Sequence, residues 1–403
     1  MTDKKLVGLF EKFLAKDNLF ADKKALQANY TPSAIPHREE QIQQIAKILA
    51  PALRLHKPSN LFVYGKTGTG KTLSVLHTTQ NLAEVASRQK VAVKVLYINC
   101  KLKKVADTEY RLVAQIARDF GREIPATGLP TQEVYQLFIN MIDSREQLLI
   151  LVLDEIDQLV KKTGDEILYT LTRVNSELKK SQVTLIGISN DLIFADNLDP
   201  RVKSSLSEEE IIFPPYNALQ IQDILRSRAK QAFKEGVLEP GVIEKCAAYA
   251  AREHGDARRA LELLRVAGEL AERAGDGSVK LQNIDEAQEK IERERVFDII
   301  TAQPKQFQVT LYAILSLANR QKSLIFTGDI YNAYREHCKP AGLAPLTQRR
   351  VSDIIAELDM LGIINARVLS KGRYGRTREI GIAIPDVAAA RALEMLEKEL
   401  NMK

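Results

Sequence analysis

A glycine-rich segment, residues 65–72, reads Gly-Lys-Thr-Gly-Thr-Gly-Lys-Thr and directly follows the mainly apolar run 60–64. This spacing after a strand is typical of a phosphate-binding loop, in which backbone N–H groups turn inward on a phosphate chain where a helix begins. In such a loop the lysine, here Lys71, reaches the terminal phosphates, and the hydroxyl of the next residue, Thr72, lies on Mg²⁺. The sequence therefore predicts a nucleoside triphosphate site that includes Gly68, Thr69, Gly70, Lys71 and Thr72.

Two acidic residues, Asp154 and Glu155, end the wholly apolar run 148–153. A buried strand of a parallel sheet delivers its last side chains to the sheet edge where ligands bind. At that edge Asp154 would hold Mg²⁺ through water, and Glu155 would polarise the water that attacks the terminal phosphate. The alternative is a solvated strand end with incidental acids. The phosphate-binding loop upstream favours the catalytic interpretation.

Three further polar residues have types and positions that suit phosphate chemistry. Asn190 follows the expected strand 183–189, where its amide would orient the attacking water, although asparagine there is also ordinary turn chemistry. Arg201 precedes the last expected strand and would stabilise transition-state charge on a nucleotide held by a neighbouring molecule. Arg258 follows Asp256, a suitable helix N-cap, and would face the γ-phosphate. The alternative for each arginine is a surface side chain in an ion pair.

The elements that must position these residues alternate from about residue 26 to 215, as short apolar strands and amphipathic helices. This alternation indicates an α/β fold with a parallel sheet. The expected strands are 60–65, 91–99, 148–154, 183–189 and 211–213. Residues 218–295 have a helical pattern too long for a connector, so they are expected to form a small all-helical domain. Segment 305–390 combines helices with a glycine-punctuated hairpin.

The third segment has the order of elements that a winged helix uses to bind DNA. Thr347 can cap a helix whose apolar positions, from Val351 to Leu361, define one buried face. Polar side chains near its start would enter the major groove. The hairpin 366–378 contains five basic residues and no acid, and it would lie along phosphates or in the minor groove. The alternative is a solvated charged hairpin. The predicted DNA-binding residues are Gln348, Arg349, Arg350, Lys371, Arg373, Tyr374, Arg376 and Arg378.

Composition limits the classes of partner. The 403 residues include 58 Lys and Arg against 52 Asp and Glu, so the net charge is +6, which is compatible with a nucleic-acid partner. No apolar stretch approaches ~18 residues, so no membrane partner is expected. The three cysteines form no metal or redox motif, which fits a reduced cytoplasmic setting. Residues 1–20 have apolar positions at helical spacing and are expected to form a short amphipathic segment rather than a leader.

Several motifs occur together and in a specific order. They are Gly-Lys-Thr-Gly-Thr-Gly-Lys-Thr, Val-Leu-Asp-Glu-Ile-Asp, Ile-Ser-Asn, Asp-Pro-Arg-Val-Lys-Ser-Ser and Gly-Asp-Ala-Arg-Arg. With them, the chain resembles, from Tyr30 through the C-terminal hairpin, the archaeal replication initiators related to the large subunit of the eukaryotic origin recognition complex and its helicase-loading, cell-division-cycle-type relative. The resemblance implies an AAA+ P-loop ATPase base, an all-helical lid and a C-terminal winged helix. The expected boundaries are 1–25 for the amphipathic segment, 26–215 for the base, 216–303 for the lid and 304–403 for the winged helix.

The resemblance also implies roles for individual residues. Asn190 matches the first sensor, Arg201 the arginine finger and Arg258 the second sensor, in the lid. The segment 30–39 is similar to the family's adenine-side motif, and the stretch after Phe213 to the part that closes over the nucleotide. The further nucleotide-binding residues that this implies are Ile35, His37, Arg38, Tyr216 and Arg228. An insertion used on DNA would correspond to about 101–131, which contains Lys101, Lys103, Lys104, Arg111 and Arg118. An exposed amphipathic helix is the alternative for that stretch.

As a whole, the resemblance implies an ATP-regulated DNA replication initiator that binds double-stranded origin DNA and helps to recruit the replicative helicase. Its cofactors would be ATP or ADP with Mg²⁺, and slow hydrolysis would act as a switch. Paralogous initiators or further copies of the chain are possible partners on DNA, and a cytoplasmic, nucleoid-associated location follows. Two alternatives remain, a branch-migration type of AAA+ winged-helix motor and an ATP-gated transcriptional regulator.

Overall fold

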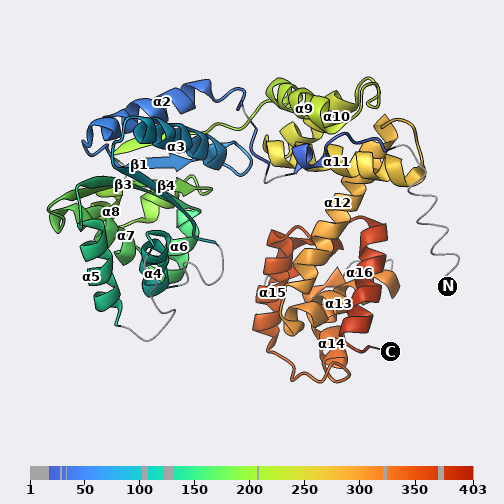
Figure 1. Cartoon of the computed structure of the whole chain (residues 1–403). Coiled ribbons are helices and arrows are strands. Elements are labelled where there is room, and N and C mark those ends of the chain that lie inside the picture. Colours follow the sequence, from blue (N-terminus) through green and yellow to red (C-terminus); the bar gives the residue numbers. More distant parts are fainter. Residues whose placement is uncertain are drawn as a thin grey trace, which may run out of the picture. The chain divides into compact units, whose positions relative to one another are not determined.

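The computed structural model describes residues 18–27, 30–32, 34–101, 108–121, 130–206, 208–320, 325–370 and 376–402. Backbone contacts divide the chain into two compact units, Met1–Ile284 and Asp285–Lys403. The first contains a parallel sheet with its helices and a group of further helices. The second contains a small antiparallel sheet with helices of its own. Figure 1 labels the helices of both units and some of the strands.

The sheet of the first unit has five strands in the order β2-β3-β4-β1-β5, and every neighbouring pair is parallel. The bounds of the strands are β1 (Leu61–Tyr64), β2 (Val93–Asn99), β3 (Gln147–Asp154), β4 (Ser181–Ser189) and β5 (Glu209–Ile212). All five predicted strands are present, with ends that differ by at most two residues. In register, Tyr64 faces Ser189, and Asp154 faces Asn99. Consequently, the phosphate-binding loop, Glu155 and Asn190 all follow the carboxyl ends of strands, at the same end of the sheet.

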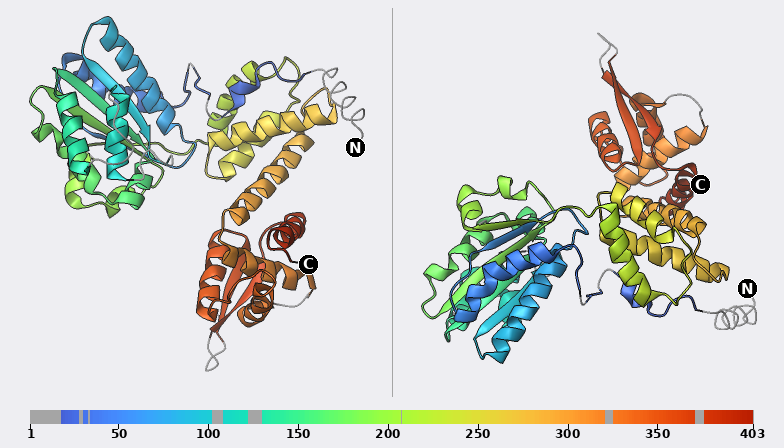
Figure 2. Two further views of the ribbon diagram at one scale, coloured as in Figure 1. Left: turned by 60° about the horizontal axis from the view of Figure 1, so that its bottom comes forward. Right: turned by 90° about the horizontal axis from the view of Figure 1, so that it is seen from above.

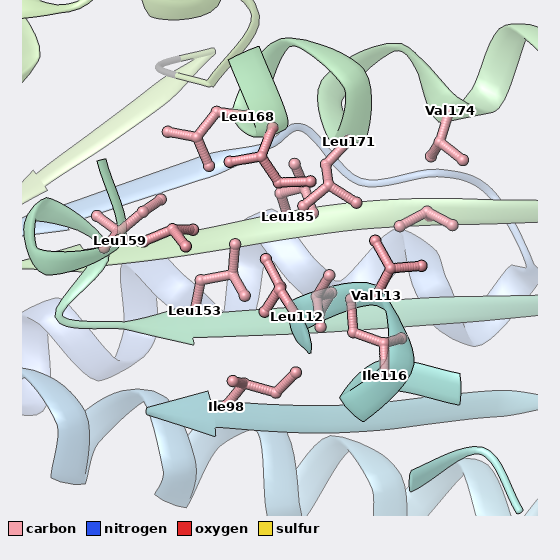
Figure 3. Packing of buried hydrophobic residues seen from close by; sticks show 14 of the residues in the cluster. Ile98, Leu112, Val113, Ile116, Leu153, Leu159, Leu168, Leu171, Val174 and Leu185 are labelled. Atoms are coloured by element: carbon pink, nitrogen blue, oxygen red, sulfur yellow. The ribbon is translucent and has the colours of Figure 1, made fainter. Parts of the chain in front are cut away.

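Strand β3 has apolar side chains on both faces of the sheet, and both faces are covered by helices. Leu149, Leu151 and Leu153 alternate with apolar residues that point the other way, as the period of two requires. One face packs on α4 (Glu109–Asp119), α5 (Thr131–Ile142), α6 (Ile156–Thr163), α7 (Glu166–Arg173) and α8 (Pro200–Leu206). Figure 3 shows leucine, isoleucine and valine side chains of this core between the strands and the helices. The other face packs on α2 (Glu39–Leu49) and α3 (Lys71–Arg88).

The helices after the sheet are α9 (Ala218–Ala232), α10 (Val242–Arg252), α11 (Ala257–Ala274) and α12 (Leu281–Thr301). An N-terminal segment, with η1 (Lys23–Leu26), packs against α9 and α11. Phe20 stacks on Phe233 with ring centroids 4.7 Å apart, and a Cβ on Gly268 would lie 2.6 Å from Cζ of Phe20. Residues 18–20 are not helical, and residues 1–17, where the rest of the amphipathic segment was expected, lie outside the described residues.

The second unit has the element order of a winged helix. After α13 (Lys305–Arg320) come β6 (Ile325–Phe326), α14 (Thr327–Cys338), α15 (Gln348–Met360), β7 (Ile364–Ser370), β8 (Arg376–Ile382) and α16 (Asp386–Glu399). The strands form an antiparallel sheet in the order β6-β8-β7, and Figure 2 shows β7 and β8 as a ribbon drawn in orange-red. As predicted, the side chain of Thr347 caps α15 and accepts from the backbone N–H of Arg350. Val351, Ile355 and Leu358 lie in the core of the unit.

No helix within the described ranges has the length and apolar character that crossing a membrane would need.

Candidate functional site

A polar cavity of about 130 Å³ lies at the carboxyl ends of strands β1, β3 and β4. It brings together the predicted phosphate-site residues from four separate parts of the chain. The lining residues are Gly68, Thr69, Gly70, Lys71, Thr72, Tyr97, Asn99, Asp154, Glu155, Asn190 and Arg258. Basic, acidic and amide side chains therefore face one small space, as the chemistry of a phosphate chain with a cation needs.

The loop before α3 has the backbone geometry of an anion site. Gly68 and Gly70 have φ values of 69° and 88°, which glycine adopts readily because it has no Cβ. Lys71 begins α3 and is only 5% exposed, and its Nζ donates to the carbonyl oxygens of Gly65 and Lys66, each at 2.7 Å. Burial lowers the pKa of Lys71 to about 8, although the nearby carboxylate of Asp154 opposes that shift.

Asp154 is held in one orientation by three donors. Its Oδ2 accepts from the hydroxyls of Thr72 at 2.9 Å and Tyr97 at 2.7 Å, and its Oδ1 accepts from the backbone N–H of Glu155 at 2.9 Å. One carboxylate and one hydroxyl are the hard oxygen donors that suit Mg²⁺ when phosphates and water complete its shell. The donor set of Thr72 and Asp154 therefore fits the expected cation.

Glu155 follows with φ 54°, a left-handed conformation that is rare for a residue with a side chain. Its Oε2 lies 3.7 Å from Nζ of Lys101, the last described residue before the gap at 102–107. This strained position between β3 and α6 turns the carboxyl group toward the cavity that it lines.

Asn190 is positioned by Ser189 and Asp157, two residues that occur in the sequence motifs without a predicted role. Ser189 Oγ accepts from the backbone N–H of Asp191 at 3.0 Å and lies 3.3 Å from Oδ1 of Asp157, which is 3% exposed. The turn that carries Asn190 is thus anchored to α6. The only sequence signal was the third acid of the Asp-Glu-Ile-Asp run.

Arg258 reaches the cavity from helix α11. The side chain of Asp256 caps this helix, as predicted, by accepting from the backbone N–H of Arg258 at 2.8 Å. Ala257 N–H donates to the carbonyl of Gly68 at 3.3 Å. The first turn of α11 is therefore joined directly to the phosphate-binding loop.

A second cavity, of about 260 Å³, adjoins Gly70 and Thr72 and has mainly apolar walls. Ile35, Tyr216 and Arg228 line it, together with Leu73 and Leu261. Mainly apolar walls with few polar groups suit a nucleotide base. The guanidinium of Arg228 lies 4.4 Å from the ring centroid of Tyr30, and its Nη1 has no hydrogen-bond partner among the described residues.

Arg38 and His37 do not line either of these two cavities. Arg38 is 2% exposed, donates from Nε to the carbonyl of Thr69 at 2.8 Å and from Nη2 to that of Pro214 at 2.5 Å, and lies 3.9 Å from the Tyr216 ring centroid. His37 Nε2 lies 3.1 Å from Asp223 Oδ2. Arg38 thus packs against Tyr216, which lines the apolar cavity, and direct nucleotide contact by Arg38 and His37 stays a prediction.

Arg201 also lies away from the phosphate cavity. It is exposed, donates from Nε and Nη2 to the carboxylate of Asp199 at 3.0 and 2.9 Å, and faces the ring of Tyr169 at 5.0 Å. These contacts lower the pKa of Asp199 to about 2. To act on a neighbouring molecule Arg201 would have to give up its pair with Asp199, and that role stays a prediction.

In the second unit a polar groove of about 640 Å³ lies between helices α14 and α15 and the hairpin. Gln348, Arg349 and Arg378 line it, and Nη1 of Arg378 donates to the carbonyl of Ser352 at 3.0 Å. Arg350 is outside the lining and lies 3.8 Å from the carboxylate of Asp353. The remaining predicted DNA-binding residues are Arg376, which begins β8, and Lys371, Arg373 and Tyr374, which lie outside the described residues.

The expected insertion at 101–131 is described only in part. Helix α4 is capped by Thr108, which accepts from the backbone N–H of Arg111 at 3.2 Å. Nη2 of Arg118 donates to Gln115 at 2.9 Å. Lys103 and Lys104 lie outside the described residues, so DNA contact by this stretch stays a prediction.

Comparison with known proteins matches all three parts of the chain. The matching family models are an AAA domain over residues 54–192, a Cdc6 AAA+ ATPase-type lid domain over 222–289 and a CDC6 C-terminal winged helix domain over 298–390. The predicted fold class, an α/β AAA+ base with an all-helical lid and a winged helix, is confirmed.

Relatives cover almost the whole chain. An ORC1-type DNA replication protein of Thermococcus onnurineus (strain NA1) is 54% identical over 388 residues, or 95% of this chain and 93% of the relative. One from Pyrococcus furiosus is 55% identical over 384 residues, or 94% and 91%. The solved structure of the Aeropyrum pernix ORC1 protein in complex with DNA is 45% identical, with a TM-score of 0.83 over 94% of this chain and 98% of that one. The protein therefore belongs to the family of archaeal ORC1-type DNA replication proteins.

Proposed function

We propose that this protein is an ATP-regulated initiator of DNA replication that binds duplex origin DNA through its winged helix and helps to recruit the replicative helicase. The observation that carries the proposal is the cavity where Lys71, Asp154, Asn190 and Arg258 meet. These side chains provide what a switch driven by a nucleoside triphosphate needs, and the chain belongs to a replication family.

Within this site the base of ATP or ADP would occupy the apolar cavity beside Tyr216, and the phosphates would lie on the loop at Gly68 to Thr72. Lys71 would exchange its two carbonyl partners for phosphate oxygens. Mg²⁺, when bound, neutralises phosphate charge. Thr72 and Asp154 would hold it, because the Thr72 hydroxyl donates its proton to Asp154 and keeps its lone pairs for a cation.

For hydrolysis, Glu155 would accept a proton from the attacking water, and Asn190 would orient that water. Arg258 would stabilise charge on the γ-phosphate from the lid. We expect slow turnover, which suits a switch, and we expect Arg201 to act in trans when copies or paralogues assemble on DNA. The lid, through Arg258, would then report which nucleotide is bound.

DNA would be contacted by the groove that contains Gln348 and Arg349, and by the basic hairpin. A helix presenting long polar side chains reads base edges, and cationic side chains on the hairpin bind phosphates. The solved relative with 45% identity is a complex with DNA, which supports DNA binding by this chain.

Footprinting on the chromosome of the source organism tests origin binding. The wild type should protect discrete duplex repeats beside the origin, and the Arg373→Ala, Arg376→Ala double variant should lose this protection. Arg391→Ala, an exposed arginine on α16 away from the groove, is the matched control and should behave as wild type. Uniform protection of any DNA, or protection confined to promoters, would contradict the initiator proposal.

Nucleotide assays separate the initiator from the motor. An initiator should hydrolyse ATP slowly and retain its footprint, whereas a branch-migration motor should accelerate hydrolysis strongly with DNA and form a closed ring. Helicase recruitment is tested by the amount of replicative helicase retained on origin DNA. It should rise with the wild type in ATP and should not rise with Lys71→Ala.

A further inference from the structure

The hydroxyl of Tyr97 contacts the acidic centre of the phosphate cavity. It donates to Oδ2 of Asp154 at 2.7 Å, and the same oxygen accepts from Thr72 at 2.9 Å. Hydrogen bonds from a hydroxyl to a carboxylate are charge-assisted and stronger than neutral ones. Two such donors on one oxygen, with Glu155 N–H on the other, hold the carboxylate in a single orientation.

The backbone places Tyr97 where this contact can form. Strand β2 lies beside β3 at the edge of the sheet, with Tyr97 facing Val152 and Asn99 facing Asp154 in register. The Tyr97 residue is 37% exposed, yet it lines the phosphate cavity. Burial and the neighbouring Asp154 raise the pKa of Tyr97, so the phenol remains a donor throughout the neutral range.

A strand tyrosine is ordinary in sequence terms, because aromatic residues favour strands and their hydroxyls commonly reach solvent. The contact with Asp154 sets this one apart from the other strand aromatics described. Tyr64, for example, ends β1 and donates to the exposed Glu210 at 3.1 Å, away from the residues lining the phosphate cavity.

We propose that Tyr97 is a positioning residue that orients the Asp154 carboxylate for the Mg²⁺ of a bound nucleotide. The inference rests on the proposed ATP site and concerns how its cation is held. Without the Tyr97 hydroxyl, Asp154 keeps Thr72 on Oδ2 and the Glu155 N–H on Oδ1, and its carboxylate is held less firmly in the position that a cation with octahedral geometry requires.

The variant Tyr97→Phe removes the hydroxyl and keeps the ring. The matched control is Tyr135→Phe, because the Tyr135 hydroxyl also pairs with a carboxylate, Glu177 at 3.3 Å, and Tyr135 does not line the phosphate cavity. Nucleotide binding is measured with a fluorescent ADP analogue, first with excess chelator and then during titration with Mg²⁺, and thermal melting checks the fold.

For Tyr97→Phe we expect the Mg²⁺ concentration for half-maximal enhancement to rise about 10- to 100-fold, the range seen when partners of metal ligands are removed. Binding in chelator should stay at the wild-type level, and Tyr135→Phe should match the wild type in both conditions. This pattern separates cation positioning from simple packing, which would not depend on Mg²⁺.

Two results would overturn the inference. One is an unchanged Mg²⁺ requirement in Tyr97→Phe, and the other is an equal loss of binding with and without Mg²⁺, which would mean that the ring or the fold is affected. If the wild type itself binds no nucleotide, the proposed ATP switch fails, and the role of Tyr97 fails with it. The wild-type titration alone identifies that case.

Discussion

Asp256 and Gly68 approach so closely that a Cβ built on Gly68 would lie 1.7 Å from Oδ1 of Asp256. Both residues are fixed in place, for different reasons. Gly68 needs a positive φ of 69°, and Asp256 needs its carboxylate on the first turn of α11 to cap the helix. The phosphate-binding loop and the lid therefore meet at this contact. A side chain at position 68 would displace the carboxylate of Asp256.

Gly68→Ala is expected to impair nucleotide binding at this junction. The left-handed backbone costs ~1–2 kcal/mol for a residue with a Cβ, and displacing Asp256 adds the ~1 kcal/mol of a lost cap. A fluorescent ADP titration should show at least about tenfold weaker binding. Gly277→Ala is the control, because a Cβ there has open space and Gly277 has no positive φ. Equal binding by both variants would contradict this account.

Ser189→Ala is expected to slow ATP hydrolysis about tenfold while nucleotide affinity stays near wild type. The variant removes the oxygen that accepts from Asp191 N–H and that links Asn190 to Asp157. Leaving the partly buried Asp191 N–H unpaired costs ~1 kcal/mol, enough to let the turn move. Phosphate release is measured with saturating ATP. Ser144→Ala, which removes an exposed hydroxyl bonded to Met141 O, should leave hydrolysis unchanged.

Nucleotide affinity should fall as the pH rises above about 8, because burial lowers the pKa of Lys71 to about 8 in the free protein. Bound phosphates favour the charged amine, so binding takes up a proton, and affinity drops by up to ~tenfold per pH unit between pH 8 and the higher pKa of the complex. Calorimetry from pH 7 to 9.5 measures this dependence. Lys71→Arg, which stays charged, should bind with little pH dependence. The same slope in both proteins would assign the effect to another group.

The lowered pKa of Lys71 also affects the free energy of unfolding. That free energy should rise with pH, whereas nucleotide affinity falls. The unfolded lysine has the usual value of 10.5, so between pH 8 and 10.5 the unfolded state binds more protons than the nucleotide-free folded state. Lys71 therefore destabilises the free protein most below pH 8, and this contribution disappears as the pH rises through that interval. Urea titrations of the wild type and Lys71→Met should converge at high pH.

Arg349→Ala is expected to weaken origin binding by ~1–3 kcal/mol, the contribution of a side chain that reads a base edge in the major groove. Binding to unrelated duplex should change much less. Competition assays at fixed salt give both affinities, and Arg391→Ala serves as the control. Equal weakening on both DNAs would show that Arg349 binds phosphate and carries no sequence information.

The residues that could be predicted from sequence belong to short motifs with a strand before them. Lys71, Asp154 and Asn190 follow apolar strands, and parallel pairing brings strand ends to one edge. Asp256 was predicted as a cap because its type and place before a helix decide its role locally. In these cases the residue type and a few neighbours along the chain are enough to predict the role of the residue.

Residues whose role depends on a distant partner were missed or only partly understood. Tyr97 is a residue type that is common in strands, so nothing in the sequence distinguishes it. Its contact with Asp154 depends on the register of β2 against β3. The guanidinium of Arg38 donates to the carbonyls of Thr69 and Pro214, which its motif did not indicate, and its contact with a nucleotide stays a prediction. Long-range packing decides which acceptor such a side chain finds, and spacing along the chain does not encode it.

The position of β1 in the sheet also governs how the protein can be made. β1 pairs with β4 and β5, so the strand that carries the phosphate-binding loop has no neighbouring strand until Ser189 has left the ribosome, and its second neighbour is complete only after Ile212. Its apolar residues Leu61, Phe62 and Val63 wait unpaired through that part of synthesis, when exposed strands associate with other chains. Nucleotide therefore meets its complete site only after this interval, because the phosphate cavity also requires Asn190 and Arg258.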